Sequence, residues 1–336
     1  MNRRNFISFF FLIGMAGGAV CQEPQFSQYY SAPLYLNPGF AGNTIQGRAV
    51  MNYRNQWPAM PGQFVTYAAS LDYNLEAYNS GVALSLEHDK AGSAALRYTN
   101  IGFHYSYTIR VSRNTAIKPG VYFSYTSRDV NQADLVFGDQ IVFDNPVSSS
   151  LNRFSVEPVR YADLGTGGII YQRNWWAGIA AHHINRPNQS LFEDQVRLPV
   201  LYTLHGGYNY VISQNARKKE ISSITGVMHY KAQGKWDQLD IGAYYRFKLV
   251  TFGLYYRGLP LLKRNGYAHP NQDAIIGLLG LEYNDFSFGY SYDLNISRLI
   301  SDSGGAHEIS LIFEFASERK KRKRTRSRFL IPCAKF

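Results

Sequence analysis

The sequence predicts an all-β protein, a transmembrane antiparallel up-and-down β-barrel of about fourteen strands. Three observations predict this fold: the expected strands are long, their residues alternate in type, and their connections alternate in length. Most expected strands have nine to thirteen residues, whereas globular strands favour about five or six and tilted membrane strands need about 9–11. The strands are expected at 47–55, 63–73, 79–89, 98–110, 115–127, 159–173, 175–187, 201–213, 220–233, 236–248, 250–259, 272–283, 285–295 and 305–316.

The alternation of residue types is clearest in three stretches. Residues 99–110 (TNIGFHYSYTIR), 285–294 (DFSFGYSYDL) and 307–315 (HEISLIFEF) each place large apolar residues at every second position. Because successive side chains of a strand point to opposite faces, each stretch has one apolar face and one polar or small face. Soluble antiparallel sheets also alternate, so a soluble, aromatic-rich β-core remains an alternative that the strand lengths disfavour.

The connections between the expected strands form two classes. The even-numbered ones are mostly short, whereas several odd-numbered ones are long, namely 128–158, 188–200, 260–271 and 296–304. Outer-membrane barrels combine short periplasmic turns with longer outer loops. The pattern therefore predicts a barrel over 47–317 in the outer membrane, with both termini in the periplasm.

The N-terminus has the features of a secretory signal over residues 1–21. Arg3 and Arg4 precede the apolar run FISFFFLIGMAGGAV, which is short for a membrane-spanning helix. Cleavage before Gln22 is expected. Cys21 leaves a lipoprotein signal as an alternative, although Val20 is bulky for one. An exported chain without another long apolar run can span a membrane only with β-structure.

Residues 22–46 form a lead-in to the first strand. Their central part, QFSQYYSAPLYLNPGFAG at 25–42, is rich in aromatic residues, has no charge, and contains two prolines that forbid a regular helix. Such a surface should be buried. We expect it to plug the barrel or to pack across the periplasmic mouth, with an unstructured spacer as the alternative. The expected lumen or partner contacts are Phe26, Tyr29, Tyr35, Asn37, Pro38 and Phe40.

The net charge of +11 is concentrated near the C-terminus. Residues 318–336 contain nine Lys or Arg and one acidic residue, and residues 5–317 carry a net charge of only +1. The charge therefore describes a tail rather than a basic face, and no nucleic-acid partner is expected. The tail is either flexible or contacts an acidic periplasmic partner or anionic lipid. The expected contacts are Arg322, Lys323, Arg324, Arg326, Arg328 and Phe336.

No catalytic motif emerges from the sequence. GTGG at 165–168 lies in an expected strand with no helix after it, which favours a bulge or a close backbone approach over a phosphate loop. Ser303 and His307 lack the pattern of a nucleophile elbow. No catalytic residue and no cofactor is therefore expected.

Two candidate metal sites are also disfavoured. His182 and His183 are adjacent in an expected strand, so we expect them to face opposite sides. Asp139 and Asp144 lie in the longest loop without the spacing of an EF-hand. No metal site is therefore expected.

Several further motifs follow one another in a specific order and spacing. They are the lead-in at 22–42, YRNQWP at 53–58, HDKAG at 88–92, LVFGDQI at 135–141, YRFKLVTFGLYYRG at 245–258, GYSYDLNISRL at 289–299, GGAHEISLIFEF at 304–315 and the final IPCAKF. This order and spacing resemble those of the PorP/SprF family of the type IX secretion and gliding machinery of Bacteroidetes. Ala334 and Lys335 stand where relatives often have Pro and Arg, a minor departure.

The resemblance implies a non-enzymatic outer-membrane barrel that supports export or surface attachment of cargo proteins. The implied partners are outer-membrane lipid, periplasmic and outer-membrane components of the type IX system, and a secreted adhesin-type cargo. Two alternatives remain open. The barrel could be a passive or hydrophobic-solute channel, because many strands have a polar or small inner face, or the anchor of an adhesin that binds through the loop at 128–158.

Overall fold

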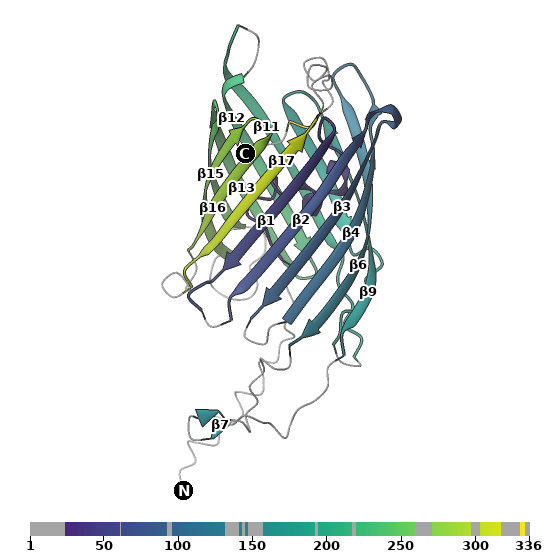
Figure 1. Cartoon of the computed structure of the whole chain (residues 1–336), viewed down its shortest axis with the longest axis vertical. Helices are drawn as coiled ribbons and strands as arrows, with labels where there is room; N and C mark the ends of the chain where they lie inside the picture. The colour runs from purple at the N-terminus through teal and green to yellow at the C-terminus, as the bar shows by residue number, and fades with distance from the viewer. Residues whose placement is uncertain are drawn as a thin grey trace.

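The computed structural model describes residues 24–60, 62–92, 96–131, 141–142, 145–146, 157–191, 194–216, 220–259, 271–296, 303–316 and 330–332. Fourteen long antiparallel strands form a closed barrel, which confirms the predicted fold (Figure 1). The strands are β1 (Gly47–Gln56), β2 (Phe64–Leu75), β3 (Ser80–Ala91), β4 (Leu96–Tyr107), β6 (Ala116–Val130), β9 (Val159–Tyr171), β10 (Trp175–His182), β11 (Leu201–Gln214), β12 (Glu220–Gln233), β13 (Trp236–Phe247), β14 (Val250–Leu259), β15 (Asn271–Tyr283), β16 (Phe286–Asn295) and β17 (Ala306–Phe315).

Each strand pairs with its neighbours in the chain, and the first and last strands close the barrel. β1 pairs with β17 from Gly47↔Phe315 to Gln56↔Ala306, and β4 pairs with β6. Closure leaves no strand edge unpaired, as a sheet in lipid requires. The remaining elements are short: β5 (Ile109–Arg110), β7 (Ile141–Val142), β8 (Asn145–Pro146), the helix α2 (Pro33–Leu36) and the 3₁₀ turns η1 (Pro38–Phe40) and η2 (Glu76–Tyr78).

The two ends of the barrel differ in their connections. At the end where β1 begins and β17 ends, which we call the turn end, the connections are short. At the opposite loop end lie the long connections 131–158, 183–200, 260–270 and 296–305, although β12 and β13 are joined there by a short turn. The turn end is at the top of Figure 1. Much of the loop at 128–158, including Asp139 and Asp144, lies outside the described residues.

The strand faces separate apolar from polar side chains. On β1, Met51 on the outer face is 61% exposed, whereas Arg48, Asn52 and Arg54 on the inner face are buried. The outer faces of the other strands carry most of the large exposed apolar residues, which suits contact with lipid. Charged and polar side chains line the interior of the barrel. The buried residues of this protein therefore lie in the barrel lumen.

One strand is shorter than the sequence predicts. The strand expected at 175–187 ends at His182, because His183 adopts a left-handed backbone with φ of 58° and the chain turns there. The amide of Ile184 then donates to the carbonyl of Leu164. The alternation of residue types does not reveal such a turn.

Candidate functional site: a segment that fills the lumen

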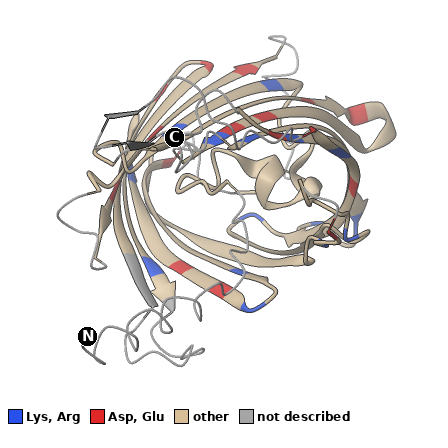
Figure 2. Cartoon of the chain, turned by 90° about the horizontal axis from the view of Figure 1, so that it is seen from below, with Lys and Arg blue, Asp and Glu red and all other residues tan. Residues whose placement is uncertain are grey.

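Residues 24–46, which we call the lumen segment, lie inside the barrel (Figure 2). Ser27 contacts side chains near the loop-end termini of β1, β14, β16 and β17. Ala41 instead accepts a hydrogen bond from Ser106, near the turn end of β4. The lumen segment therefore runs along the barrel from the loop end to the turn end, where β1 begins.

Glu308 of β17 anchors the start of the lumen segment. Its carboxylate accepts hydrogen bonds from the backbone amides of Ser27 at 2.7 Å and Gln28 at 3.0 Å. The Gln28 side chain donates to the Glu308 carbonyl at 2.9 Å and accepts from the Ser310 hydroxyl at 2.6 Å. Because Glu308 is completely buried, these bonds form away from water, where each is costly to lose.

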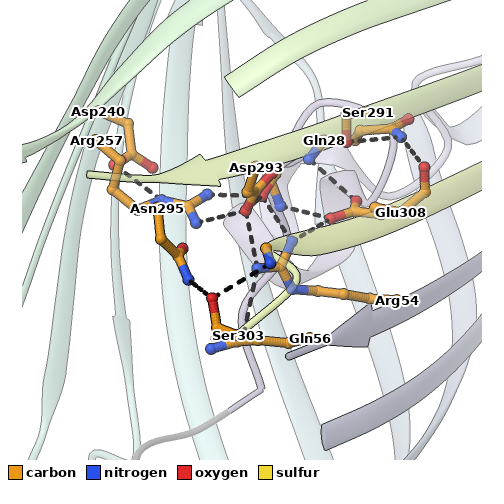
Figure 3. A network of polar contacts seen from close by, with 12 residues as sticks. Gln28, Arg54, Gln56, Asp240, Arg257, Ser291, Asp293, Asn295, Ser303 and Glu308 are labelled. Atoms are coloured by element: carbon orange, nitrogen blue, oxygen red, sulfur yellow. Dashed lines mark hydrogen bonds and ion pairs between the residues drawn. The ribbon is translucent and has the colours of Figure 1, made fainter. Parts of the chain in front are cut away.

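Ser27 also joins two arginines and a carboxylate from three strands. Figure 3 shows that these partners, Arg54, Arg257 and Asp293, point toward one another. The Ser27 hydroxyl accepts from Arg54 at 2.7 Å and Arg257 at 2.8 Å, and donates to Asp293 at 2.6 Å. The same two guanidinium groups pair with Asp293 at 2.9 and 3.0 Å. Arg54 also lies 3.2 Å from Glu308. We call Arg54, Arg257, Asp293 and Glu308 the latch.

The four charged side chains of the latch are buried, so they must compensate one another's charges. All four side chains are at most 4% exposed. Arg257 has a further carboxylate, that of Asp240, at 3.5 Å. A buried ion network is weak evidence for overall stability. Removing one member, however, leaves an uncompensated buried charge and destabilises the protein by roughly 3–5 kcal/mol. The latch therefore fixes one position for residues 27 and 28.

Asn37 holds the middle of the lumen segment against the opposite side of the barrel. Its amide nitrogen donates to the carbonyls of Ile179 at 2.8 Å and Gly168 at 3.2 Å, and lies 3.2 Å from a ring nitrogen of His205. Its oxygen accepts from the amide of Gly39 at 2.8 Å and so caps the turn η1. Every hydrogen-bonding atom of this buried side chain has a partner.

Glycines on the inner wall make room for this part of the segment. A Cβ at Gly120 of β6 would lie 2.5 Å from the amide nitrogen of Gly39. A Cβ at Gly167 would lie 2.4 Å from the Asn37 oxygen, and one at Gly81 would lie 2.1 Å from the carbonyl of Ala41. At the GTGG motif, the group that lies closest to Gly167 is the Asn37 side chain rather than another backbone, so the expected close backbone approach stays a prediction there.

Aromatic packing fills the remaining space. Tyr29, Tyr30 and Phe40 belong to one buried cluster with wall residues that include Trp176 and Tyr255. Tyr30 packs edge-to-face on Trp176 at 5.4 Å, and Tyr29 packs in the same way on Tyr255 at 5.8 Å. Each such aromatic pair contributes about 0.5–1.5 kcal/mol to stability beyond the contribution of its buried apolar surface.

The C-terminal part of the chain returns to the same cluster. Ile331 is 2% exposed and packs in the cluster, and its amide donates to the side chain of Asn43 at 2.9 Å. Residues 330–332 thus lie at the turn end, beside the end of the lumen segment. The described chain begins near the other end, because Pro24 lines a cavity with Trp236 at the β12–β13 turn.

The six expected lead-in contacts all lie in the lumen segment. Of these, Phe26, Tyr29, Asn37, Pro38 and Phe40 are buried and Tyr35 is partly buried; their function as a plug or partner contact stays a prediction. The expected tail contacts, Arg322, Lys323, Arg324, Arg326, Arg328 and Phe336, lie outside the described residues. The latch, the glycine wall and Ile331 were not anticipated, although charged residues at inward-facing strand positions were a usable signal for the latch.

The argument against His182 and His183 as a pair needs correction. Both rings line the same cavity, with centroids 6.3 Å apart, because His183 leaves the strand geometry. His183 instead bonds to Asp163 at 2.7 Å. Within the described residues, no group of three or more His, Cys, Asp or Glu side chains is placed to hold a metal ion, and no helix there is long and apolar enough to cross a membrane.

Comparison with known proteins identifies the family. A model of the family described as type IX secretion system membrane protein PorP/SprF matches residues 19–313. The chain belongs to the PorP/SprF family. The resemblance stated from the sequence motifs is thereby confirmed, and membership together with the barrel fold fits an outer-membrane location.

Several solved structures are similar to this PorP/SprF barrel at low sequence identity. Omp33 of Acinetobacter baumannii is 8% identical, with 82% of this chain and 100% of that chain covered and a TM-score of 0.48. The CymD monoaromatic hydrocarbon channel is 12% identical, with 85% of this chain and 93% of that chain covered and a TM-score of 0.47. A Pseudomonas aeruginosa FadL homologue is 12% identical, with 80% of this chain and 90% of that chain covered and a TM-score of 0.44. A search of curated proteins found no match.

Proposed function

We propose that this protein is a closed outer-membrane barrel that supports type IX secretion through protein–protein contacts, without catalysing a reaction. Family membership supports the association with secretion. One structural observation supports contacts rather than conduction: the lumen segment is tied to both sides of the barrel by Ser27, Gln28 and Asn37. A lumen occupied in this way leaves little space for solute flow.

In this proposal the turn end faces the periplasm, as short connections do in outer-membrane barrels. The C-terminal residues 330–332 then lie at the periplasmic mouth, where machinery in the periplasm docks. The start of the described chain, at Pro24, lies toward the outer side. This differs from the expectation that both termini share the periplasmic side. Periplasmic and outer-membrane secretion components and a secreted adhesin-type cargo remain the proposed partners.

The proposal is tested by deleting the gene and replacing it with the wild-type or a latch variant. Loss of secretion or surface display of type IX cargo in the deletion strain, restored by the wild-type gene, is the expected result. A deletion strain that secretes and displays every cargo normally would remove the proposed function. Fractionation of the complementing protein should place it in the outer membrane.

A passive channel is the second candidate, and a cavity inside the barrel favours it. This cavity, of about 240 Å³, lies between the lumen segment and the loop end. Planar-bilayer recording separates the two candidates. A closed barrel should show no stable conductance in the wild type and a stable conductance after deletion of residues 24–44, whereas a channel should conduct in both forms.

A further inference from the structure

The cavity at the loop end is a pocket with a floor. The floor is made by the lumen segment, through Tyr29, Leu34, Tyr35 and Leu36. The volume of about 240 Å³ lies just below the 300–1,000 Å³ typical of small-molecule pockets. The pocket is therefore sized for a single ring rather than for an extended molecule.

The walls come from strands on several sides of the barrel. They carry mainly neutral hydrogen-bonding groups, and Trp236 and Tyr98 add aromatic rings toward the loop end. The wall residues with hydrogen-bonding side chains include Asn100, Thr203, Gln233 and Gln238, four histidines, and the charged residues Glu87, Lys231, Asp237 and Asp240.

The walls are held in place before any ligand arrives. His104 stacks on Tyr122 with ring centroids 5.3 Å apart and an interplanar angle of 18°. One of its ring nitrogens also bonds the Ser85 hydroxyl at 2.9 Å. His229 packs on Tyr29 of the floor at 4.9 Å. A pre-formed pocket reduces the ordering cost of binding.

The charges of the lining disfavour several classes of ligand. Among the described lining residues, Lys231 is the one Lys or Arg, whereas Glu87, Asp237 and Asp240 supply three carboxylates, so a phosphate or other polyanion would be poorly matched. A hydrocarbon would strip water from the amides and carboxylates without replacing their hydrogen bonds, which is costly.

We propose that this pocket binds one pyranose ring of a carbohydrate at the loop end. A pyranose has apolar C–H faces that stack on aromatic rings and hydroxyl groups around its edge that need both donors and acceptors. Tyr35 of the floor and Trp236 of the wall would supply rings. Asn100 and Gln238 would offer their amide oxygens, and Glu87 its carboxylate, as acceptors for the hydroxyls. The Asn100 nitrogen already donates to Ser124 and Thr126, and the Gln238 nitrogen to Asp240. This inference rests on the pocket alone and holds whether or not the barrel serves secretion.

The test is calorimetric titration of the purified full-length mature protein with glucose, galactose, mannose and N-acetylglucosamine. Toluene and inorganic phosphate serve as ligands of the disfavoured classes, and a short oligosaccharide distinguishes a free sugar from a glycan end. At least one pyranose should bind saturably, with Kd of about 1 mM, as expected for a few contacts. Saturable binding of toluene or phosphate alone, or of nothing, would overturn the proposal.

Variants locate the binding. Trp236→Ala and Asn100→Ala should each weaken binding at least tenfold. Tyr202→Ala is the matched control, because Tyr202 is 59% exposed on the outer face of β11, and its binding should equal that of the wild type. Heat-modifiability on gels verifies that each variant is folded. If both pocket variants are folded and bind as tightly as the wild type, the site lies elsewhere and the proposal is wrong.

Discussion

Replacing Glu308 with alanine should release the start of the lumen segment while the barrel stays closed. The variant removes the acceptor of the Ser27 and Gln28 amides and one partner of Arg54. The ladder between β1 and β17 uses backbone groups and is unaffected. The effect should therefore be local, a change in the free energy of opening of residues 24–30 rather than in barrel assembly.

The size of the effect follows from what is left unpaired. Breaking a buried ion pair by removing one partner costs roughly 3–5 kcal/mol, and each unsatisfied buried amide has a desolvation cost of about 1–3 kcal/mol. Relaxation and water entry reduce the sum, so we expect about 3–5 kcal/mol in total. This corresponds to an opening equilibrium larger by between about a hundredfold and a few thousandfold.

Hydrogen exchange with mass spectrometry measures this opening directly. Peptides covering 24–30 should exchange faster in Glu308→Ala by that factor, whereas peptides from the middle of β2 should exchange as in the wild type. Glu76→Ala is the control, because Glu76 is exposed in a turn. Unchanged exchange of residues 24–30 in Glu308→Ala would refute the reasoning that Glu308 anchors the segment.

Three further predictions concern the rest of the lumen segment and the C-terminus. Gly120→Ala should displace residues 38–40 and speed their exchange, because the new Cβ would lie 2.5 Å from a backbone nitrogen, whereas Gly226→Ala, with open space around it, should not. Asn37→Asp should destabilise the segment by about 1–3 kcal/mol, because a carboxylate would face two carbonyls that now accept from the amide; equal exchange in variant and wild type would contradict this. Ile331→Ala should leave a cavity and speed tryptic cleavage of the C-terminal region severalfold, and a cleavage rate equal to that of the wild type would show that Ile331 anchors nothing.

The strands could be predicted because their signal is local. In β4, β16 and β17 the alternation of residue types indicates which side chains face lipid. The length of each alternating stretch indicates the length of the strand. The end of β10 was missed because it depends on the left-handed backbone of His183, which no apolar pattern encodes. The same residue invalidated the argument that His182 and His183 face opposite sides.

The interior contacts could not be read from the sequence. Ser27 and Glu308 are 281 positions apart, and only the closure of the barrel brings them together. The lack of charge in residues 25–42 indicated burial but not which wall they would contact. Inner-face glycines such as Gly81 and Gly120 have no distinguishing neighbours in the sequence, because their importance comes from a segment that packs against them.

Disulfide cross-linking tests most directly whether the lumen segment occupies the barrel in the membrane. Gln28→Cys and Ser310→Cys, in a background with Cys333→Ser, join positions whose side chains now bond at 2.6 Å. Ser287→Cys with Ile312→Cys, a directly paired position on neighbouring strands, is the positive control. Rapid formation of both cross-links in outer-membrane preparations, detected by mass spectrometry, is the predicted result. A control pair that cross-links while positions 28 and 310 do not would contradict the claim that the lumen segment fills the barrel.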